Sequence, residues 1–410
     1  MTDSVAPGPM AGLRVLEVAS HVFVPVAGAL LAEWGADVIK VEHPVTGDAY
    51  RGLVTAGLHT SYRGVDVNFQ YANRAKRSVG IDLASDRGRG LLDLLMEQSD
   101  VFLTNLRPAA VRRLRIDVDD VRAANPAAIY VRGTGQGPSG PDADRGGYDT
   151  AAYWSRSGMS ARLTPPGGYP SLPPPAFGDF AAGLALAGAI STALYRRAVT
   201  GVPSVVDVSL LGVGMWQMQP DIVDAMIGAP ANDAAARPSR YDTPNPLVQH
   251  YRTRDARFVA LVMVDADRHW VNLCETIGAP DLAADPRFVD RHARRTNARA
   301  CVERLDEVFA QRDLADWCRI LDHATGVWAP VREPAELPDD PQVDVNGYLG
   351  QADLGDGGSL PMVTSPMQFD GTATPPRRAP EHGEHTEEVL LALGLTWNEI
   401  SELKAAEVVN

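Results

Sequence analysis

The alternation of strand-like and helix-like segments in the first half of the chain constrains the fold most strongly. Residues 13–20 form an apolar run with few breaks, typical of a strand buried on both faces, and a helix-like stretch follows at 27–36. Further strand-like runs lie at 37–42, 77–83, 100–105, 128–135 and 203–210, with helical patterns at 85–99 and 118–124. Repeated units of this kind predict an α/β fold, in which helices cover a parallel sheet.

The composition along the chain indicates a second, smaller domain. Residues 228–246 are rich in glycine, proline and alanine, which is typical of a linker. A strand-like run at 257–264 and helical stretches near 266–277, 297–311 and 314–322 follow it. A length of 410 residues agrees with more than one domain.

Charge and hydropathy exclude some classes of partner. The formal net charge of −14 argues against nucleic acid, because a phosphate-binding surface needs a basic excess. No targeting pattern is visible, and the most apolar stretch, 180–195, is short and ends at Arg196 and Arg197, so we expect a core helix and no membrane span. Three cysteines without CxxC spacing indicate reduced thiols, and we predict a cytoplasmic protein.

The motifs predict neither a metal site nor a permanently bound cofactor. The glycine-rich stretch 133–140 follows a strand, as in dinucleotide-binding proteins, but Pro138 and Pro141 oppose the helix that such a site needs. The sequence has no Walker-type phosphate loop, no HExxH motif and no GxSxG elbow. Two basic groups lie near the ends of predicted strands, and they fit either a phosphorylated ligand at the sheet edge or solvated surface charge. The groups are Arg74, Lys76 and Arg77, and Arg107, Arg112, Arg113 and Arg115.

Asp179 stands between a glycine- and proline-rich segment, 136–178, and an alanine-rich helical stretch. Aspartate is a favoured N-cap residue, and capping alone would account for it. The same position would stabilise an ionised carboxylate and place backbone N–H groups beside a developing oxyanion, as a nucleophile in acyl transfer requires. The residue types leave both interpretations open.

Seven segments in this order resemble the family III CoA-transferases, also called the CaiB/BaiF family. They are residues 12–48, 73–83, 104–114, 133–149, 177–180 ("FGDF"), 339–343 and 377–395. The resemblance implies a large Rossmann-like domain with a parallel sheet, formed by residues 1–227 and completed by the linker and C-terminal part 334–410. It also implies a small α+β domain at 247–333 and an interlocked homodimer. The implied reaction moves coenzyme A from an acyl-CoA to a free carboxylic acid through an aspartyl-CoA thioester on Asp179.

The resemblance also assigns residues to the binding of coenzyme A. Asn105 and Arg113 match positions that line the nucleotide pocket. Lys76 and Arg77 match contacts to the adenosine phosphate region. His43 stands where the family often has an arginine for the diphosphate.

Four further residues match the acyl side of the family's site. Tyr148 and Asp149 correspond to the pair beside the reacting thioester, where Asp149 shapes the site. Val22 and Phe23 occupy a stretch in which some members have a glutamine, so we expect a less polar acyl pocket. The glycine-rich flap of the oxalate-handling branch is absent after residue 228, and formyl or oxalyl transfer is therefore not expected.

Two alternative functions are left open. The same fold hosts 2-methylacyl-CoA racemases, which remove an α-proton with a His–Asp pair. Here Tyr148 stands where that histidine would be, and a tyrosine with a pKa of about 10 is a poor base. The other alternative is a non-catalytic acyl-CoA-binding protein, against which the presence of Asp179 argues.

Overall fold

The computed structural model of this chain describes residues 8–165, 167–228 and 239–410. They form two units. Unit 1 contains the described residues up to Leu163, Pro170–Val223 and Pro341–Asn410, and unit 2 contains those of Thr164–Tyr169 and Asp224–Asp340. The segment 247–333, predicted as a small domain, lies within unit 2. Most of the predicted linker 228–246 lies outside the described residues.

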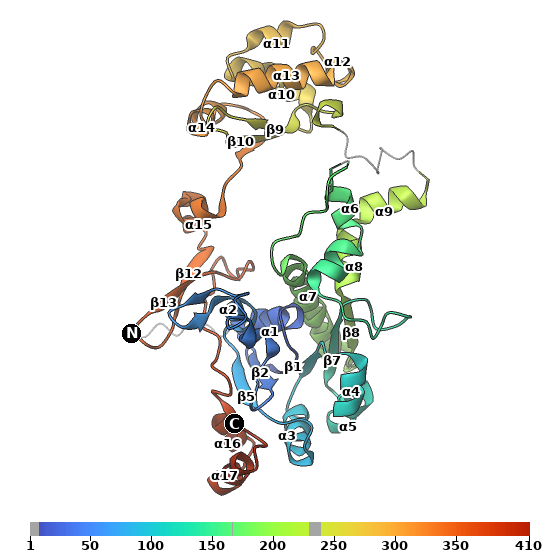
Figure 1. Ribbon diagram of the computed structural model, residues 1–410, viewed down its shortest axis with the longest axis vertical. Helices are drawn as coiled ribbons and strands as arrows, with labels where there is room; N and C mark the ends of the chain where they lie inside the picture. Colours follow the sequence, from blue (N-terminus) through green and yellow to red (C-terminus); the bar gives the residue numbers. More distant parts are fainter. Residues whose placement is uncertain (1–7, 166, 229–238) are drawn as a thin grey trace. The chain divides into compact units, whose positions relative to one another are not determined.

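Unit 1 is built on a six-stranded sheet in which all neighbouring strands are parallel (Figure 1). Its strands are β1 (Arg14–Val18), β2 (Asp37–Glu42), β5 (Arg77–Gly80), β6 (Val101–Thr104), β7 (Ile129–Thr134) and β8 (Val205–Ser209). Their order, β5-β2-β1-β6-β7-β8, is that of a doubly wound sheet, and the direction of winding reverses between β1 and β6. The predicted α/β class with a Rossmann-like parallel sheet is confirmed.

The central strand β1 shows why helices are needed on both faces of the sheet. Leu16 is in register with Ile39 on one side and with Phe102 on the other, and all three belong to the core on one face. Their sequence neighbours, among them Val15, Val101 and Leu103, belong to the core on the opposite face. Strands that are apolar on both faces must be covered twice.

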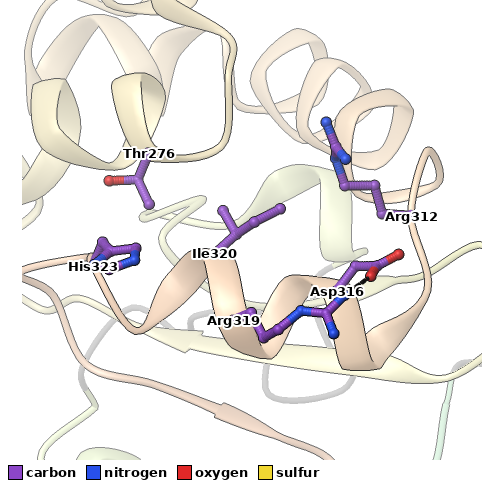
Figure 2. A pocket seen from close by; sticks show the side chains of 6 residues that line it. All are labelled: Thr276, Arg312, Asp316, Arg319, Ile320 and His323. Carbon is purple, nitrogen blue, oxygen red and sulfur yellow. Dashed lines mark hydrogen bonds and ion pairs between the residues drawn. The ribbon is translucent and has the colours of Figure 1, made fainter.

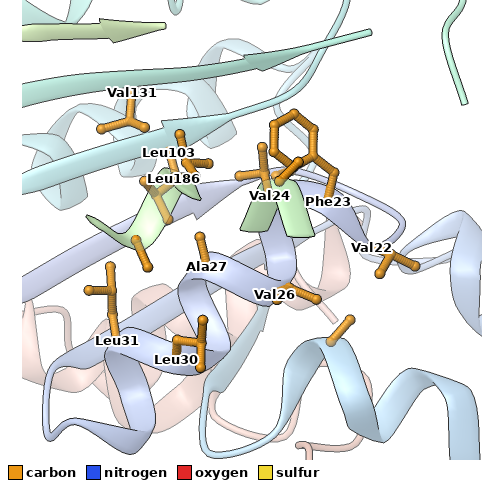
Figure 3. Packing of buried hydrophobic residues seen from close by; sticks show 14 of the residues in the cluster. Val22, Phe23, Val24, Val26, Ala27, Leu30, Leu31, Leu103, Val131 and Leu186 are labelled. Carbon is orange, nitrogen blue, oxygen red and sulfur yellow. The ribbon is translucent and has the colours of Figure 1, made fainter. Parts of the chain in front are cut away.

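One face of the sheet is covered by α1 (Phe23–Glu33) and α7 (Phe177–Thr200), which pack against each other (Figure 3). A Cβ at position 183 of α7 would lie 2.6 Å from Cγ1 of Val26, so Gly183 permits this close approach. One side of α7 is therefore part of the core, as the sequence predicts. Within the described ranges, α7 is also the one helix whose length and apolar composition would suffice to cross a membrane, a property that core helices share.

The other face is covered by helices from both ends of the chain. The helices α3 (Asp86–Glu97) and α5 (Val118–Ala124) come from the N-terminal third of the chain. The helices α16 (Thr386–Ala392) and α17 (Trp397–Ala405) come from its C-terminal part. The N–H of Gly80 in β5 donates to Oγ1 of Thr386 (3.0 Å). The C-terminal segment thereby joins the same unit as the first strands.

Apart from the sheet and helices of unit 2 described below, the remaining elements are short, with at most eight residues each. They are the 3₁₀ helices η1 (Ala49–Leu53), η3 (Arg240–Asp242) and η4 (Pro334–Asp339), the π-helix η2 (Thr150–Ser155), the α-helices α2 (Val67–Asn73), α4 (Pro108–Leu114), α6 (Met159–Leu163), α8 (Leu210–Gln217), α9 (Gln219–Met226) and α15 (Pro341–Val345), and the hairpins β3 (Ser61–Tyr62) with β4 (Val65–Asp66) and β12 (Leu349–Asp353) with β13 (Ser359–Val363).

Unit 2 has a core of its own around a small antiparallel sheet. The sheet contains β9 (Val248–Arg252), β10 (Phe258–Val262) and β11 (Trp328–Pro330) in the order β11-β10-β9. Its helices are α10 (Ala266–Thr276), α11 (Pro280–Ala284), α12 (Arg291–Thr296), α13 (Ala298–Phe309) and α14 (Leu314–Leu321). Cys274 and Cys301 are buried free thiols in this core, and burial raises the pKa of each to about 12.

Candidate active site

A cavity of about 470 Å³ lies at the carboxyl ends of β1 and β6, where the winding of the sheet reverses. Ligands of doubly wound sheets bind at this switch point. Its walls come from the loop after β1, the loop after β6, the segment before η2 and the first turn of α7. The cavity brings together five of the residues predicted from the sequence: Val22, Phe23, Asn105, Tyr148 and Asp179.

Asn105 links the two loops that meet at the switch point. Its Nδ2 donates to the carbonyl oxygen of Ser20 (2.7 Å), and its Oδ1 accepts from the N–H of Ser20 (3.0 Å). Both ends of the amide are thus used to fix the loop that carries Val22 and Phe23. Those two side chains are buried and stand at the start of α1, beside the core between α1 and α7 (Figure 3). Tyr148, by contrast, is 68% exposed.

Asp179 does not cap α7. The helix begins at Phe177, and its N-cap residue is Ala176, whose φ of 58° is in the left-handed region. Asp179 lies in the first turn, half-buried, with its side chain on the cavity. The N-cap interpretation that the sequence left open is therefore wrong, because the chain enters this helix three residues earlier.

Asp149 performs the capping from a distant position in the chain. Its Oδ1 accepts a hydrogen bond from the N–H of Gly178 (3.1 Å). Burial raises the pKa of Asp149, and the hydrogen bonds from the backbone of Gly178 and Phe177 act in the opposite direction. A Cβ at position 178 would lie 2.2 Å from Cγ of Tyr153 and 2.5 Å from Oδ1 of Asp149, so only glycine lets the carboxylate reach the helix.

At neutral pH, the carboxyl group of Asp179 is divided between its protonated and ionised forms. Burial raises its pKa to about 7, and the negative charge of Asp149 adds to the shift. Within the described chain no hydrogen bond or cation opposes this rise. The nearby Tyr50 hydroxyl has a pKa raised to about 12 by burial and by the carboxylates of Asp66 and Asp179, so it stays protonated and can donate. A carboxylate whose environment favours loss of its charge is a good candidate for chemistry.

His43 and Arg113 line a neighbouring cavity of about 370 Å³. The two cavities share Ser20 and Leu106. The Nδ1 of His43 accepts from the backbone N–H groups of Val45 and Thr46 (both 3.2 Å). An accepting Nδ1 leaves the proton of the neutral ring on Nε2, which can then donate to an anionic ligand.

Lys76 and Arg77 lie apart from both cavities. The ammonium of Lys76 is buried and donates to Glu17 (2.9 Å), to the carbonyl oxygen of Ala72 (2.9 Å) and to Oδ1 of Asn73 (3.0 Å), which uses all three of its donors. Arg77 donates to Asp37 from its Nε (2.8 Å). Both residues line a third cavity, of about 410 Å³, instead. Because the Lys76 ammonium is buried and fully paired, this geometry lends no support to the contact with coenzyme A that the family resemblance implies, and that contact stays a prediction.

Unit 2 carries a separate cavity of about 410 Å³ (Figure 2). Its lining residues are Thr276, Arg312, Asp316, Arg319, Ile320 and His323. Arg319 and Asp316 form an ion pair along α14, drawn as a dashed line in Figure 2. None of the residues predicted for the site lines this cavity.

The structure adds two aromatic residues, His21 and Tyr50, that the sequence analysis did not select. His21 lines the cavity of Asp179, and its ring lies edge-on to Tyr148 (5.4 Å between centroids) and to Tyr50 (6.2 Å). His21 directly follows the end of the first strand region. Its position at the carboxyl end of a parallel strand is the signal by which it could have been found.

Comparison with known proteins decides the family. The sequence model described as "CoA-transferase family III" matches residues 10–386. The chain belongs to CoA-transferase family III. The resemblance seen in the motifs is thereby confirmed, and with it the assignment as an enzyme that acts on coenzyme A thioesters.

Relatives of this family III CoA-transferase match over nearly their whole length. An (R)-2-hydroxy-4-methylpentanoate CoA-transferase from Clostridioides difficile is 30% identical over 404 residues, which is 97% of this chain and 98% of the relative. A cinnamoyl-CoA:phenyllactate CoA-transferase from Clostridium sporogenes is 28% identical over 400 residues, 96% of this chain and 95% of the relative. The crystal structure of a CAIB/BAIF family protein from Brucella suis is similar, with a TM-score of 0.80, 27% identity and coverage of 94% of this chain and 100% of that chain.

Proposed function

We propose that this family III CoA-transferase moves coenzyme A from an acyl-CoA to a free carboxylic acid through a thioester on Asp179. The observation that carries the proposal is the position of this carboxylate: it lines the switch-point cavity in the first turn of α7, with no stabilising partner within the described chain. A buried polar group that only supports structure is normally hydrogen bonded. Here Asp149 supports the helix, and Asp179 is left available for reaction.

The proposed reaction needs no other source of energy. The Asp179 carboxylate attacks the donor thioester carbon, the C–S bond breaks, and a mixed anhydride and a CoA thiolate form. The thiolate attacks the Asp179 carbonyl, which releases the donor acid as its carboxylate and leaves aspartyl-CoA. The acceptor carboxylate attacks this thioester, and the two steps run in reverse to give the new acyl-CoA and free Asp179. Each intermediate divides one difficult exchange into easier steps.

The neighbouring cavity is the proposed place of the CoA phosphates. Arg113 is exposed there and can form paired hydrogen bonds with a phosphate, and the Nε2–H of His43 can donate a further one. The shared boundary at Ser20 and Leu106 allows one extended ligand to occupy both cavities. Its thioester end would then reach Asp179.

The acyl group is proposed to be an acid with an apolar chain. Val22 and Phe23 give the cavity an apolar side next to Asp179. The two curated relatives act, by their names, on (R)-2-hydroxy-4-methylpentanoate and on phenyllactate. Both are 2-hydroxy acids with an apolar side chain, and we take this class as the acceptor.

The test is the mass of the intact protein after incubation with a panel of acyl-CoAs and no acceptor. We expect a gain equal to coenzyme A less one water, located on a peptide that contains Asp179, together with release of the donor acid. A transfer reaction without any covalent adduct on this peptide would contradict the mechanism.

The reaction should depend on pH through Asp179. Since only the ionised carboxylate attacks, and burial raises its pKa to about 7, we expect kcat/KM to rise about tenfold per pH unit below pH 7 and to level off above it. Asp149→Asn removes the neighbouring charge but keeps an oxygen that accepts from Gly178, so the acidic limb should move to lower pH. Steady-state rates between pH 5 and 9 measure both profiles, and an unmoved limb in the variant would contradict this assignment.

We also propose that the enzyme is a cytoplasmic, interlocked homodimer, as its family resemblance implies. In a single chain the outer side of α7 exposes Tyr195 (72%) and Val199 (66%), apolar side chains that a second copy would cover. Sedimentation at decreasing concentration should show a dimer that does not dissociate while folded. A folded monomer on dilution would contradict the interlocked arrangement.

A further inference from the structure

We propose that His21 recognises the 2-hydroxyl group of the acceptor acid, and so sets the substrate class of this active site. The inference rests on the proposed function, because it takes the reacting carboxyl group to lie at Asp179. His21 lines the same cavity as Asp179 and directly precedes Val22 and Phe23, the residues on its apolar side.

The backbone at His21 is held in an unusual conformation. Its φ of 64° is in the left-handed region, which costs an L-residue about 1–2 kcal/mol. The N–H of His21 donates to Oδ1 of Asp48 (3.2 Å), and Oδ2 of Asp48 lies 2.8 Å from the buried ammonium of Lys40. A fully buried ion pair therefore fixes the residue that presents the ring. Non-glycine residues in such conformations cluster at functional sites.

The ring itself is positioned by two tyrosines. Its plane makes angles of 84° with Tyr148 and 72° with Tyr50, so both contacts are edge-on. The described residues supply no hydrogen bond to either ring nitrogen, although the side chain is half-buried. Both nitrogens are thus available to a ligand, one as a donor and one as an acceptor in the neutral ring.

The chemistry of the cavity indicates which ligand atom the ring would meet. When the acceptor carboxyl group lies at Asp179, the nearest substituents of the acid are those on C2. The two side chains that follow His21, those of Val22 and Phe23, are apolar, so on the cavity this loop offers the imidazole and the short hydroxyl of Ser20 as its polar side chains. A site built to hydrogen-bond a substrate hydroxyl discriminates strongly against the analogue without it, because the buried group is then left unpaired.

The experiment compares two matched acceptors, 2-hydroxy-4-methylpentanoate and 4-methylpentanoate, with the acyl-CoA that labels the wild-type protein as common donor. The wild type should prefer the 2-hydroxy acid in kcat/KM. His21→Phe keeps an aromatic ring between the tyrosines but has no ring nitrogen, and the preference should fall at least tenfold. His21→Gly also removes the ring and suits a φ of 64°, so it is expected to fold and to lose the preference equally.

His21→Asn is the conservative variant that tells recognition from packing. Asparagine tolerates the left-handed region and can both donate and accept, so part of the preference should return. The inference is overturned if His21→Phe and His21→Gly keep the wild-type ratio, or if the wild type transfers CoA equally well to both acids while Asp179 is still labelled. If no acid accepts CoA and no adduct forms on Asp179, the proposed function fails, and this inference with it.

Discussion

Asp179→Asn is expected to lower kcat for CoA transfer by about 10⁴-fold or more, because loss of a covalent nucleophile has effects of this size. The amide has nearly the shape of the carboxylate and leaves the cavity intact, but its nitrogen lone pair is delocalised and cannot form the anhydride. Acyl-CoA binding should stay measurable, since His43 and Arg113 are unchanged in the neighbouring cavity. Transfer rates and binding of a labelled acyl-CoA measure the two effects separately.

The same substitution should stabilise the folded protein at alkaline pH. The folded-state pKa of Asp179, about 7, lies above the usual value of 3.8, so the wild type loses stability as pH rises from about 4 to 7. The full shift corresponds to about 4 kcal/mol, and partial exposure of the side chain reduces our expectation to about 2 kcal/mol. Urea unfolding at pH 8 should show the gain for Asp179→Asn, and at pH 4 the difference should vanish.

A matched control is available on the exposed helix α9. Asp224→Asn makes the same chemical change at an exposed position outside the cavity, and it should alter neither the rate nor the pH dependence of stability. Exchange of CoA at the wild-type rate by Asp179→Asn, with mass spectrometry showing no deamidation to aspartate, would contradict the proposed nucleophile.

The sheet was predictable from the sequence because its strands carry their own signal. All six strands of the parallel sheet fall within the predicted apolar runs, and parallel strands buried on both faces read as continuous runs. Their C-terminal ends then locate the switch point, and with it the loops of His21 and Asn105. The π-helix Thr150–Ser155 and α6 were missed, because they lie in a segment whose glycines and prolines resemble a loop.

The roles of individual charged residues were less predictable because they depend on contacts between distant parts of the chain. Aspartate at a helix start is a good local predictor of a cap, yet the cap of α7 comes from Asp149, 29 residues before the Gly178 that it binds. Lys76 looks like a surface cation at a strand, yet it pairs with Glu17, 59 residues away, in the interior. Because the partners are far apart in the sequence, neither pairing can be recognised from the residues next to Asp179 or Lys76.

Gly178→Ala should separate the position of Asp179 from its chemistry. The added methyl group would overlap the ring of Tyr153 and the carboxylate of Asp149, so the first turn of α7 must shift or Asp149 must leave it. Misplacement of a reacting group by about 1 Å can lower the rate about 10²-fold. We expect kcat to fall by this factor or more, with a lower Tm, although Asp179 itself is unchanged.

Gly188→Ala is the control on the same helix, because within a single chain a Cβ at position 188 meets nothing within 4 Å. Alanine is favoured over glycine inside a helix by about 1 kcal/mol, so this variant should keep wild-type kcat and unfold at the same or a higher temperature. Both variants change helix propensity in the same way, so the difference between their kcat values reports the contacts at position 178, among them the contact with Asp149. If Gly178→Ala turned over as fast as Gly188→Ala, the close approach of Asp149 to the helix would have no part in positioning the nucleophile.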